Sequence, residues 1–342
     1  TDLDALTING HTTLNGSVVE TVNDQLYNGT TTLGASNAIT TSGGGNVTFI
    51  GTVDGSADFA EDLSISTGAG DIDFQSAVGS NVNLGDITIV SANNVDFDST
   101  LDADSVTQLA GDGTTTFRGD VTLNAAGGVG IDLTGTNVTF EGVQVTTANG
   151  GTVDMTHSGL LSMDNDANFT LDGSFNEDGG GTTSTGADIT TTDDDVTFNS
   201  ATTLTETITL TAGGGAVTFN NTLDSATTAE GLTSDAATTT FNFAVGNGSA
   251  LDFVTTTGDT NINGGIVTTV GAQTYGDDAA ADATVINANT TLTAGSVTFG
   301  STLDGSADFA EDLEITTGAG YIDFQGAVGS TNDLGDITIV SA

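Results

Sequence analysis

The stretch "GSADFAEDLSISTGAGDIDFQSAVGSNVNLGDITIVSA" (residues 55–92) occurs again, almost unchanged, as "GSADFAEDLEITTGAGYIDFQGAVGSTNDLGDITIVSA" (residues 305–342). The two copies align without gaps and differ at only seven of 38 positions. Upstream, a weaker match joins "TINGHTTLNGSVVETVNDQLYNG" (7–29) to "TTTGDTNINGGIVTTVGAQTYGD" (255–277). The chain therefore contains one long period of 250 residues and part of the next.

A shorter period lies inside the long one and is marked by phenylalanine. In the regular parts of the chain these residues are 20 to 25 positions apart. Such a spacing is typical of a solenoid coil, which is too small to bury its own apolar face and must stack on its neighbours. About 15 coils of this size fit into the chain, and residues 141–195 follow the pattern less well. The phenylalanines stand in a V/I/T-x-F setting at Phe49, Phe74, Phe97, Phe117, Phe140, Phe198, Phe219, Phe241, Phe299 and Phe324.

Within each coil, apolar and polar residues alternate as they do along β-strands. In "NVTF" (46–49), for example, Val and Phe take one face while Asn and Thr take the other. Clusters of Gly, Asn and Asp predict turns at 42–46, 67–71 and 176–181. No segment shows the apolar spacing of a helix, and residues 57–63 are predicted to form a loop.

These features predict an all-β solenoid in which short parallel strands of successive coils are hydrogen-bonded side by side. Each Phe would then lie above its counterpart in the next coil. The absence of Pro agrees with this fold, because ladder positions need their N–H groups. A β-sandwich is the alternative, but sandwiches do not usually carry so many near-equivalent units. We therefore expect residues 1–342 to form one continuous solenoid segment.

The composition limits the partners of the protein. Asp and Glu total 46 against one basic residue, Arg118, which gives a formal charge of −45. Such a chain repels nucleic acid and anionic membranes, because phosphate binding needs Lys and Arg. The same charge favours a saline or calcium-rich setting, such as seawater or the cell exterior, where cations screen it. No apolar run is long enough to span a bilayer, so membrane insertion is not expected.

Three phrases resemble the repeat region of filamentous-haemagglutinin-like proteins, the very large secreted adhesins of Gram-negative bacteria. They are "TTLTAGSVTFGSTLDGSADFAEDLEITTGAGYIDFQGAVG" (290–329), "GLTSDAATTTFNFAVGNG" (231–248) and "NINGGIVTTVGAQTYGD" (261–277), and the first and third have earlier copies 250 residues upstream. The resemblance implies a right-handed parallel β-helix, export to the cell surface, and a role as a shaft or adhesive fibre. It carries over no binding site, because such repeats are scaffold.

Enzymes that cleave acidic polysaccharides also use parallel β-helices, so catalytic groups must be considered. General acid–base chemistry usually recruits His, Lys, Arg or paired carboxylates. The chain has two histidines, His11 and His157, and one arginine. His157 could face a groove, although a surface histidine is the simpler interpretation, and an anionic sugar would find almost no basic partner. We therefore predict a protein that is not an enzyme.

Carboxylate clusters are the stronger chemical signal. Ca²⁺ takes six to eight oxygen ligands, and Gly-rich turns place carbonyl oxygens near carboxylates. The sequence therefore predicts weak calcium sites in the two copies of one acidic turn, and the alternative is a solvated acidic turn without metal. We expect Ca²⁺ to bridge these turns to strand backbone or to a neighbouring molecule. The candidate ligands are Asp54, Asp58, Glu61 and Asp62 and, in the second copy, Asp304, Asp308, Glu311 and Asp312.

Two further patterns carry less weight. Arg118-Gly119-Asp120 is the integrin-binding tripeptide, but three residues arise easily by chance. Threonine-rich segments such as "ATTTF" (237–241) raise the question of ice binding, which flat threonine arrays on a β-helix can perform. In the sequence the threonines are scattered and interrupted by Asp, so ice binding is not favoured.

The expected function is structural: a segment of an extracellular bacterial fibre or giant adhesin shaft. The second copy stops at Ser341-Ala342, whereas the first runs on from Ser91-Ala92 into "NNVDF". We expect either an internal piece of a longer chain or a discrete subunit that polymerises head to tail. Copies of itself, or adjoining repeats, are the expected partners. A glycan-binding rod that recognises surface glycans is a further alternative.

Overall fold

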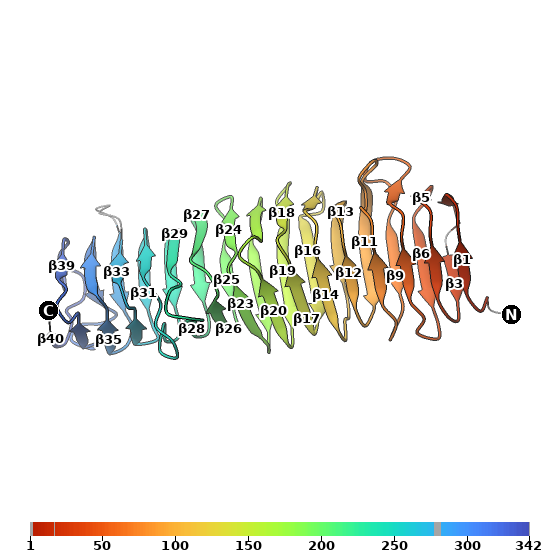
Figure 1. The fold of residues 1–342 in the computed structure, drawn as a ribbon. Helices are drawn as coiled ribbons and strands as arrows, with labels where there is room; N and C mark the ends of the chain where they lie inside the picture. The colour runs from red at the N-terminus through yellow and green to blue at the C-terminus, as the bar shows by residue number, and fades with distance from the viewer. Residues whose placement is uncertain (1–2, 17, 277–281, 342) are drawn as a thin grey trace. The chain divides into compact units, whose positions relative to one another are not determined.

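A computed structural model describes residues 3–16, 18–276 and 282–341. These residues form β-strands and no helix, which confirms the predicted all-β class. The strands pair in parallel and stack as a β-solenoid of about 15 turns (Figure 1). The contacts divide the chain into two compact units, unit 1 (Thr1–Ser174 with Asp178–Gly181) and unit 2 (Phe175–Glu177 with Thr182–Ala342). In the described part of the chain, no helix could span a membrane.

Unit 1 is built from short strands that pair with the coils before and after them. In one sheet, the register joins Phe49 to Phe74 and Phe74 to Phe97, so one coil takes 25 and the next 23 residues. The predicted coil length is therefore confirmed. The strands are β1 (Leu6–Ile8), β2 (Thr12–Leu14), β3 (Val18–Thr21), β4 (Gln25–Tyr27), β5 (Thr31–Leu33), β6 (Asn37–Thr41), β7 (Val47–Phe49), β8 (Val53–Gly55), β9 (Leu63–Ser66), β10 (Ile72–Phe74), β11 (Leu84–Ser91), β12 (Val95–Phe97), β13 (Leu101–Gln108), β14 (Thr114–Phe117), β15 (Val121–Leu123), β16 (Val129–Gly135), β17 (Asn137–Phe140), β18 (Gln144–Thr147), β19 (Thr152–His157), β20 (Leu160–Met163) and β21 (Asn168–Leu171).

Unit 2 has the same construction. Its register joins Phe198 to Phe219 and Phe219 to Phe241, again about one coil apart. The strands are β22 (Phe175–Gly179, whose last two residues are grouped with unit 1), β23 (Thr182–Thr185), β24 (Asp188–Thr191), β25 (Val196–Phe198), β26 (Ala201–Leu204), β27 (Ile208–Phe219), β28 (Leu223–Ser225), β29 (Leu232–Phe241), β30 (Val254–Thr256), β31 (Asp259–Ile262), β32 (Ile266–Thr268), β33 (Ala272–Tyr275), β34 (Ala283–Ile286), β35 (Thr290–Thr293), β36 (Ser296–Phe299), β37 (Thr302–Gly305), β38 (Leu313–Thr316), β39 (Ile322–Phe324) and β40 (Ile337–Ser341).

Aromatic rings stack on one another inside each unit, as the phenylalanine spacing predicts. In unit 1 the stack runs from Tyr27 to Phe140, with ring centroids 4.7 to 5.1 Å apart and planes within 13° of parallel. It changes to an edge contact of 74° between Phe140 and Phe169, because Met163 takes the next in-register position. Each aromatic pair adds about 0.5–1.5 kcal/mol beyond the area it buries.

An asparagine ladder follows the aromatic positions of unit 2. Each side-chain amide donates to the amide oxygen of the asparagine one coil earlier, over donor–acceptor distances of 2.5 to 3.3 Å. Amide ladders of this kind stabilise stacked parallel strands. The sequence signal is the Asn that directly follows the inward Phe or Ile. The members are Asn176, Asn199, Asn220, Asn242, Asn263 and Asn287.

The weak upstream echo of the long period has a structural counterpart. The buried hydroxyl of Tyr27 donates to Gln25 Oε1 at 2.8 Å, and the buried hydroxyl of Tyr275 donates to Gln273 Oε1 at 3.1 Å. Both glutamine amides in turn donate to strand carbonyls. The two echoes therefore build the same buried polar pair. Residue 277, which ends the second echo, and Ala342, which ends the second long copy, lie outside the described residues.

Most predicted turns and loops are confirmed, with one exception. Turns or irregular backbone occupy 42–46 and 67–71, as predicted. The same holds for 57–62, and β9 begins at Leu63, the last residue of the predicted loop. The turn predicted at 176–181 is wrong in its first part, because β22 runs to Gly179. Glu177 is fully buried there, and its Oε2 accepts the backbone N–H groups of Asn199 and Ser200 at 3.0 and 2.9 Å. These bonds let a charged residue occupy an inward strand position.

We expect Asn242→Ala to destabilise unit 2, because the substitution breaks two ladder bonds and leaves Asn220 and Asn263 without these partners. The cost should be about 1–3 kcal/mol, measured as a lower urea midpoint by circular dichroism. Asn247→Ala is the matched control, since Asn247 is exposed in a loop of the same unit. Equal midpoints for the two variants would contradict a stabilising ladder.

Candidate functional site

The carboxylates of many aspartates, in turns and in strands, bind the backbone of a neighbouring coil. In each case a side-chain oxygen accepts an N–H group 21 to 24 residues further on, at 2.6 to 3.0 Å. A backbone N–H group must find an acceptor whether it lies in a turn or at a strand. Much of the acidity is therefore structural. The pairs are Asp24 with Asn46, Asp71 with Asn94, Asp104 with Ala126, Asp120 with Gln144, Asp188 with Thr209, Asp195 with Ala216 and Asp259 with Ala283.

The acidic turn at 54–62 is the most elaborate case. Glu61 is buried and accepts the N–H groups of Ser56 and Ala57 at 2.8 and 3.1 Å and the Ser56 hydroxyl at 2.6 Å. Asp54, also buried, accepts the N–H group of Asn81 in the next coil at 2.9 Å. The loop between these two carboxylates carries Phe59 outward at a positive φ of 56°. The two buried carboxylates therefore fix both ends of an outward loop.

The second copy repeats this geometry in unit 2. Asp304 accepts the Thr331 N–H group at 2.8 Å, Glu311 accepts the Ser306 N–H group at 3.0 Å, and Phe309 again has a φ of 56°. Asp308 and Asp312 remain exposed, as Asp58 and Asp62 do in unit 1. These four exposed carboxylates also accept backbone N–H groups of the next coil, at 2.8 to 3.2 Å.

A third loop of this kind, at 224–230, was not predicted from the sequence. Asp224 accepts the N–H groups of Gly248 and Ser249, Glu230 accepts the Thr227 N–H group at 2.9 Å, and Thr228 takes the positive φ. The signal was present in "SATTAEGL" (225–232), which matches "SADFAEDL" (56–63) in its Ser-Ala, Ala-Glu and Leu positions. In the structure this loop is one residue shorter than the loop at 54–61. Seven positions separate the bridge residue Leu223 from Glu230, whereas eight separate Val53 from Glu61.

Hydrogen bonding shifts the pKa of two loop glutamates. Burial acts to raise the pKa of Glu230, but the hydrogen bonds from Ser225, Thr227 and Ala229 outweigh it and lower the pKa from 4.5 to about 2. The same balance, with burial opposed by bonds from Ser56 and Ala57, lowers the pKa of Glu61. Both loops are therefore built around an ionised carboxylate.

The predicted calcium ligands thus fall into two groups. Asp54, Glu61, Asp304 and Glu311 are buried in protein hydrogen bonds, whereas the other member carboxylates of each turn are exposed. Of these, Asp62 already accepts a hydrogen bond at each oxygen, from the Asp86 N–H group and the Ser36 hydroxyl. Within residues 3–16, 18–276 and 282–341, no three His, Cys, Asp or Glu side chains come together in a metal-type cluster. Calcium binding at these turns stays a prediction, with Asp58, Asp62, Asp308 and Asp312 as its available ligands.

Arg118 of the Arg-Gly-Asp tripeptide is engaged inside unit 1. Its Nη1 lies 2.8 Å from Asp96 and 2.7 Å from Asp98, and its Nε lies 3.2 Å from Glu141. These hydrogen bonds raise the pKa of the guanidinium, with burial opposing them. Asp120 accepts the Gln144 N–H group. Both charged residues of the tripeptide therefore connect neighbouring coils, which accounts for them without an integrin.

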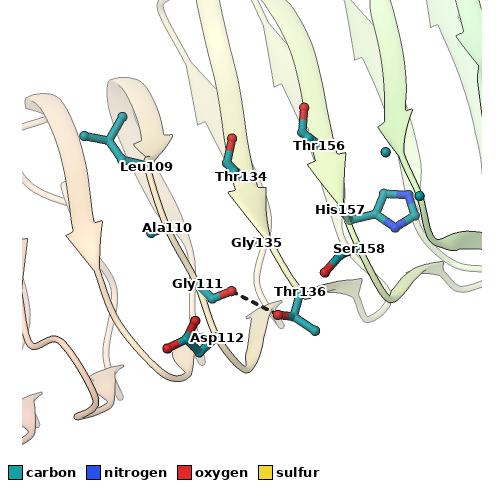
Figure 2. Close-up of a pocket in the computed structure, with 12 residues that line it drawn as sticks. Leu109, Ala110, Gly111, Asp112, Thr134, Gly135, Thr136, Thr156, His157 and Ser158 are labelled. Carbon is teal, nitrogen blue, oxygen red and sulfur yellow. Dashed lines mark hydrogen bonds between the residues drawn. The ribbon is translucent and has the colours of Figure 1, made fainter.

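A shallow hollow of about 390 Å³ lies on unit 1 where several coils turn (Figure 2). Its wall combines the exposed Leu109 with Thr134, Thr156 and Ser158, and Asp112 is its only acidic lining residue. No Lys or Arg lines it. Hydroxyls, backbone groups and the apolar side chains of Leu109 and Ala110 suit a neutral, hydroxyl-rich ligand. Surface glycans were predicted as alternative partners, and this hollow is where one could bind. Glycan binding stays a prediction.

The prediction of a surface position for His157 is wrong. The residue ends β19, borders the hollow, and is only 1% exposed. Its Nδ1 lies 3.1 Å from the Gly159 carbonyl oxygen, to which an Nδ1–H tautomer donates. It takes an inward strand position, in alternation with Met155, so packing explains its burial. His11 is exposed, with Nδ1 2.7 Å from the Thr30 hydroxyl.

Comparisons with known proteins identify no relative. No protein-family model matches the chain, and searches of the curated proteins and of the solved structures find no match. The fold and the geometry of its repeated surfaces therefore carry the functional argument.

We expect Glu230→Gln to destabilise unit 2 at neutral pH by about 1.5–3 kcal/mol, since it removes the charge from an acceptor of several hydrogen bonds. A lowered pKa means that the carboxylate stabilises the fold fully above pH 4.5 and that this contribution is lost as the pH falls towards 2. Urea midpoints of wild type and variant should therefore converge over that range.

Glu206→Gln is the matched control, because Glu206 is exposed in the same unit. A gap between wild type and Glu230→Gln that persists unchanged at pH 2, or that Glu206→Gln reproduces, would contradict the role assigned to the ionised carboxylate.

Proposed function

We propose that this chain is a structural segment of an extracellular bacterial fibre or giant adhesin shaft. The observation that carries the proposal is the continuity of the side-chain ladders through successive coils of each unit. Tyr27 to Phe140 stack in unit 1, and six asparagines are hydrogen-bonded in series in unit 2. A solenoid of this kind adds stability coil by coil, which suits a load-bearing element.

Calcium stabilisation is part of the proposal, and it predicts a lower melting temperature after chelation. We expect EDTA at low ionic strength to lower the melting temperature, and Ca²⁺ to restore it more effectively than an equal ionic strength of Na⁺. Asp58→Asn combined with Asp62→Asn should reduce the response, because these carboxylates are exposed beside Gly-rich backbone. If EDTA leaves the melting temperature unchanged at low salt, calcium has no structural role here.

The structural proposal predicts where the protein is found. Antibodies to this chain should label fibres on the surface of the source cells in immunogold electron microscopy, and label confined to the cell interior would overturn the proposal. Native material, fully denatured in EDTA and guanidinium, then separates the two forms of the proposal by mass. A polypeptide many times 33.9 kDa indicates a giant shaft, and a species near that mass indicates a polymerising subunit.

A further inference from the structure

Five threonines of unit 2 form an in-register row across consecutive coils. Thr209 of β27 pairs with Thr233 of β29, and the row continues through Thr255, Thr274 and Thr298 on β30, β33 and β36. It ends at Asp323 of β39. Residues that look scattered in the sequence are thus aligned by the coil period, which corrects the expectation that interruptions by Asp prevent a threonine array.

The side chains of this row point away from the core. Each threonine stands between two buried strand residues, and alternate residues of a strand face opposite sides of the sheet. Thr209 is exposed, and the other four are half-buried. The buried flanking pairs are Ile208 and Leu210, Leu232 and Ser234, Val254 and Thr256, Gln273 and Tyr275, and Val297 and Phe299.

The backbone fixes the spacing of the row. Hydrogen-bonded strands lie about 4.7–4.9 Å apart, so each hydroxyl and each methyl group repeats at that interval. A β-branched side chain is stiff at χ1, and the buried neighbours hold the strands in place. No charged residue interrupts the five positions. Thr211 and Thr257 add outward hydroxyls beside the row, although Asp235 lies between them and accepts the Thr257 hydroxyl at 2.9 Å.

We propose that this threonine row binds the surface of ice. A single hydroxyl gains little from such contact, because liquid water competes for it. A rigid row gains collectively, since its groups are already ordered and repeat at a spacing close to that of oxygen rows on ice. Exposed Thr122, Thr146 and Thr170 form a shorter row of the same kind in unit 1. The proposal does not depend on the fibre function.

The test measures ice-recrystallisation inhibition and thermal hysteresis with the full chain. Wild-type protein should inhibit recrystallisation, and Thr255→Lys should require a concentration higher by about tenfold for the same effect. The lysine interrupts the middle of the row and projects into the ice contact. Thr233→Lys is a second variant at a neighbouring position, so that the test does not depend on one substitution being tolerated.

Thr203→Lys is the matched control. Thr203 is also a half-buried outward threonine of unit 2, but its register neighbours are Ser184 and Asp224. It should leave the ice activity unchanged, and circular dichroism should show all three variants folded. Absence of ice activity in the wild type, or equal loss in Thr203→Lys and Thr255→Lys, overturns the proposal.

Discussion

The in-register parallel hydrogen-bond ladder is the constraint on which the rest of this structure depends. Because each residue lies about 4.8 Å from its counterpart in the next coil, any side chain must be compatible with a near-copy of itself on both sides. Stacked rings satisfy this requirement inside, as Phe49, Phe74 and Phe97 do. Amides satisfy it by donating one way and accepting the other, as Asn220 and Asn242 do. Like charges satisfy it poorly: Arg118 pairs with Asp96 beside the Asp73–Asp96 row, whereas burial and the in-register Asp154 raise the pKa of Asp132.

That constraint also explains how a chain of charge −45 can be folded. Carboxylates repel one another in a row, but at the turns they meet N–H groups that no strand partner satisfies. Asp71 binds the backbone of Asn94, and Asp104 that of Ala126, one coil later in each case. Hydrogen bonds to charged acceptors are stronger than neutral ones. The acidity is therefore an element of the fold as well as a property of the surface.

The phenylalanine period predicted the coil length, the parallel pairing and the ring stack, because an aromatic side chain at strand spacing has few places other than a stacked core. The capping aspartates could not be predicted in this way, because the N–H group that each one binds lies more than 20 residues away. The loop at 224–230 was not predicted because it is one residue shorter than the loop at 54–61. The burial of His157 could not be predicted because it depends on β19 extending as far as this residue. The Gly- and Asp-rich composition predicted a turn at 176–179. A strand forms there instead, and the hydrogen bond from the Asn199 N–H group to the Glu177 carboxylate stabilises it.

A solenoid places its outer residues at the same spacing as its inner ones, and this affects the kind of functional site that it can form. An enzyme concentrates unlike groups at one point, whereas the ladder of this protein distributes like groups along a line. The same spacing that buries Phe219 against Phe241 holds Thr233 next to Thr255 on the outer face. A ligand that recognises one such residue recognises it weakly, but a ligand with a matching period engages several at no further cost in ordering the protein. A periodic partner, such as a crystal surface or another stack of coils, would therefore gain more from this architecture than a compact ligand would.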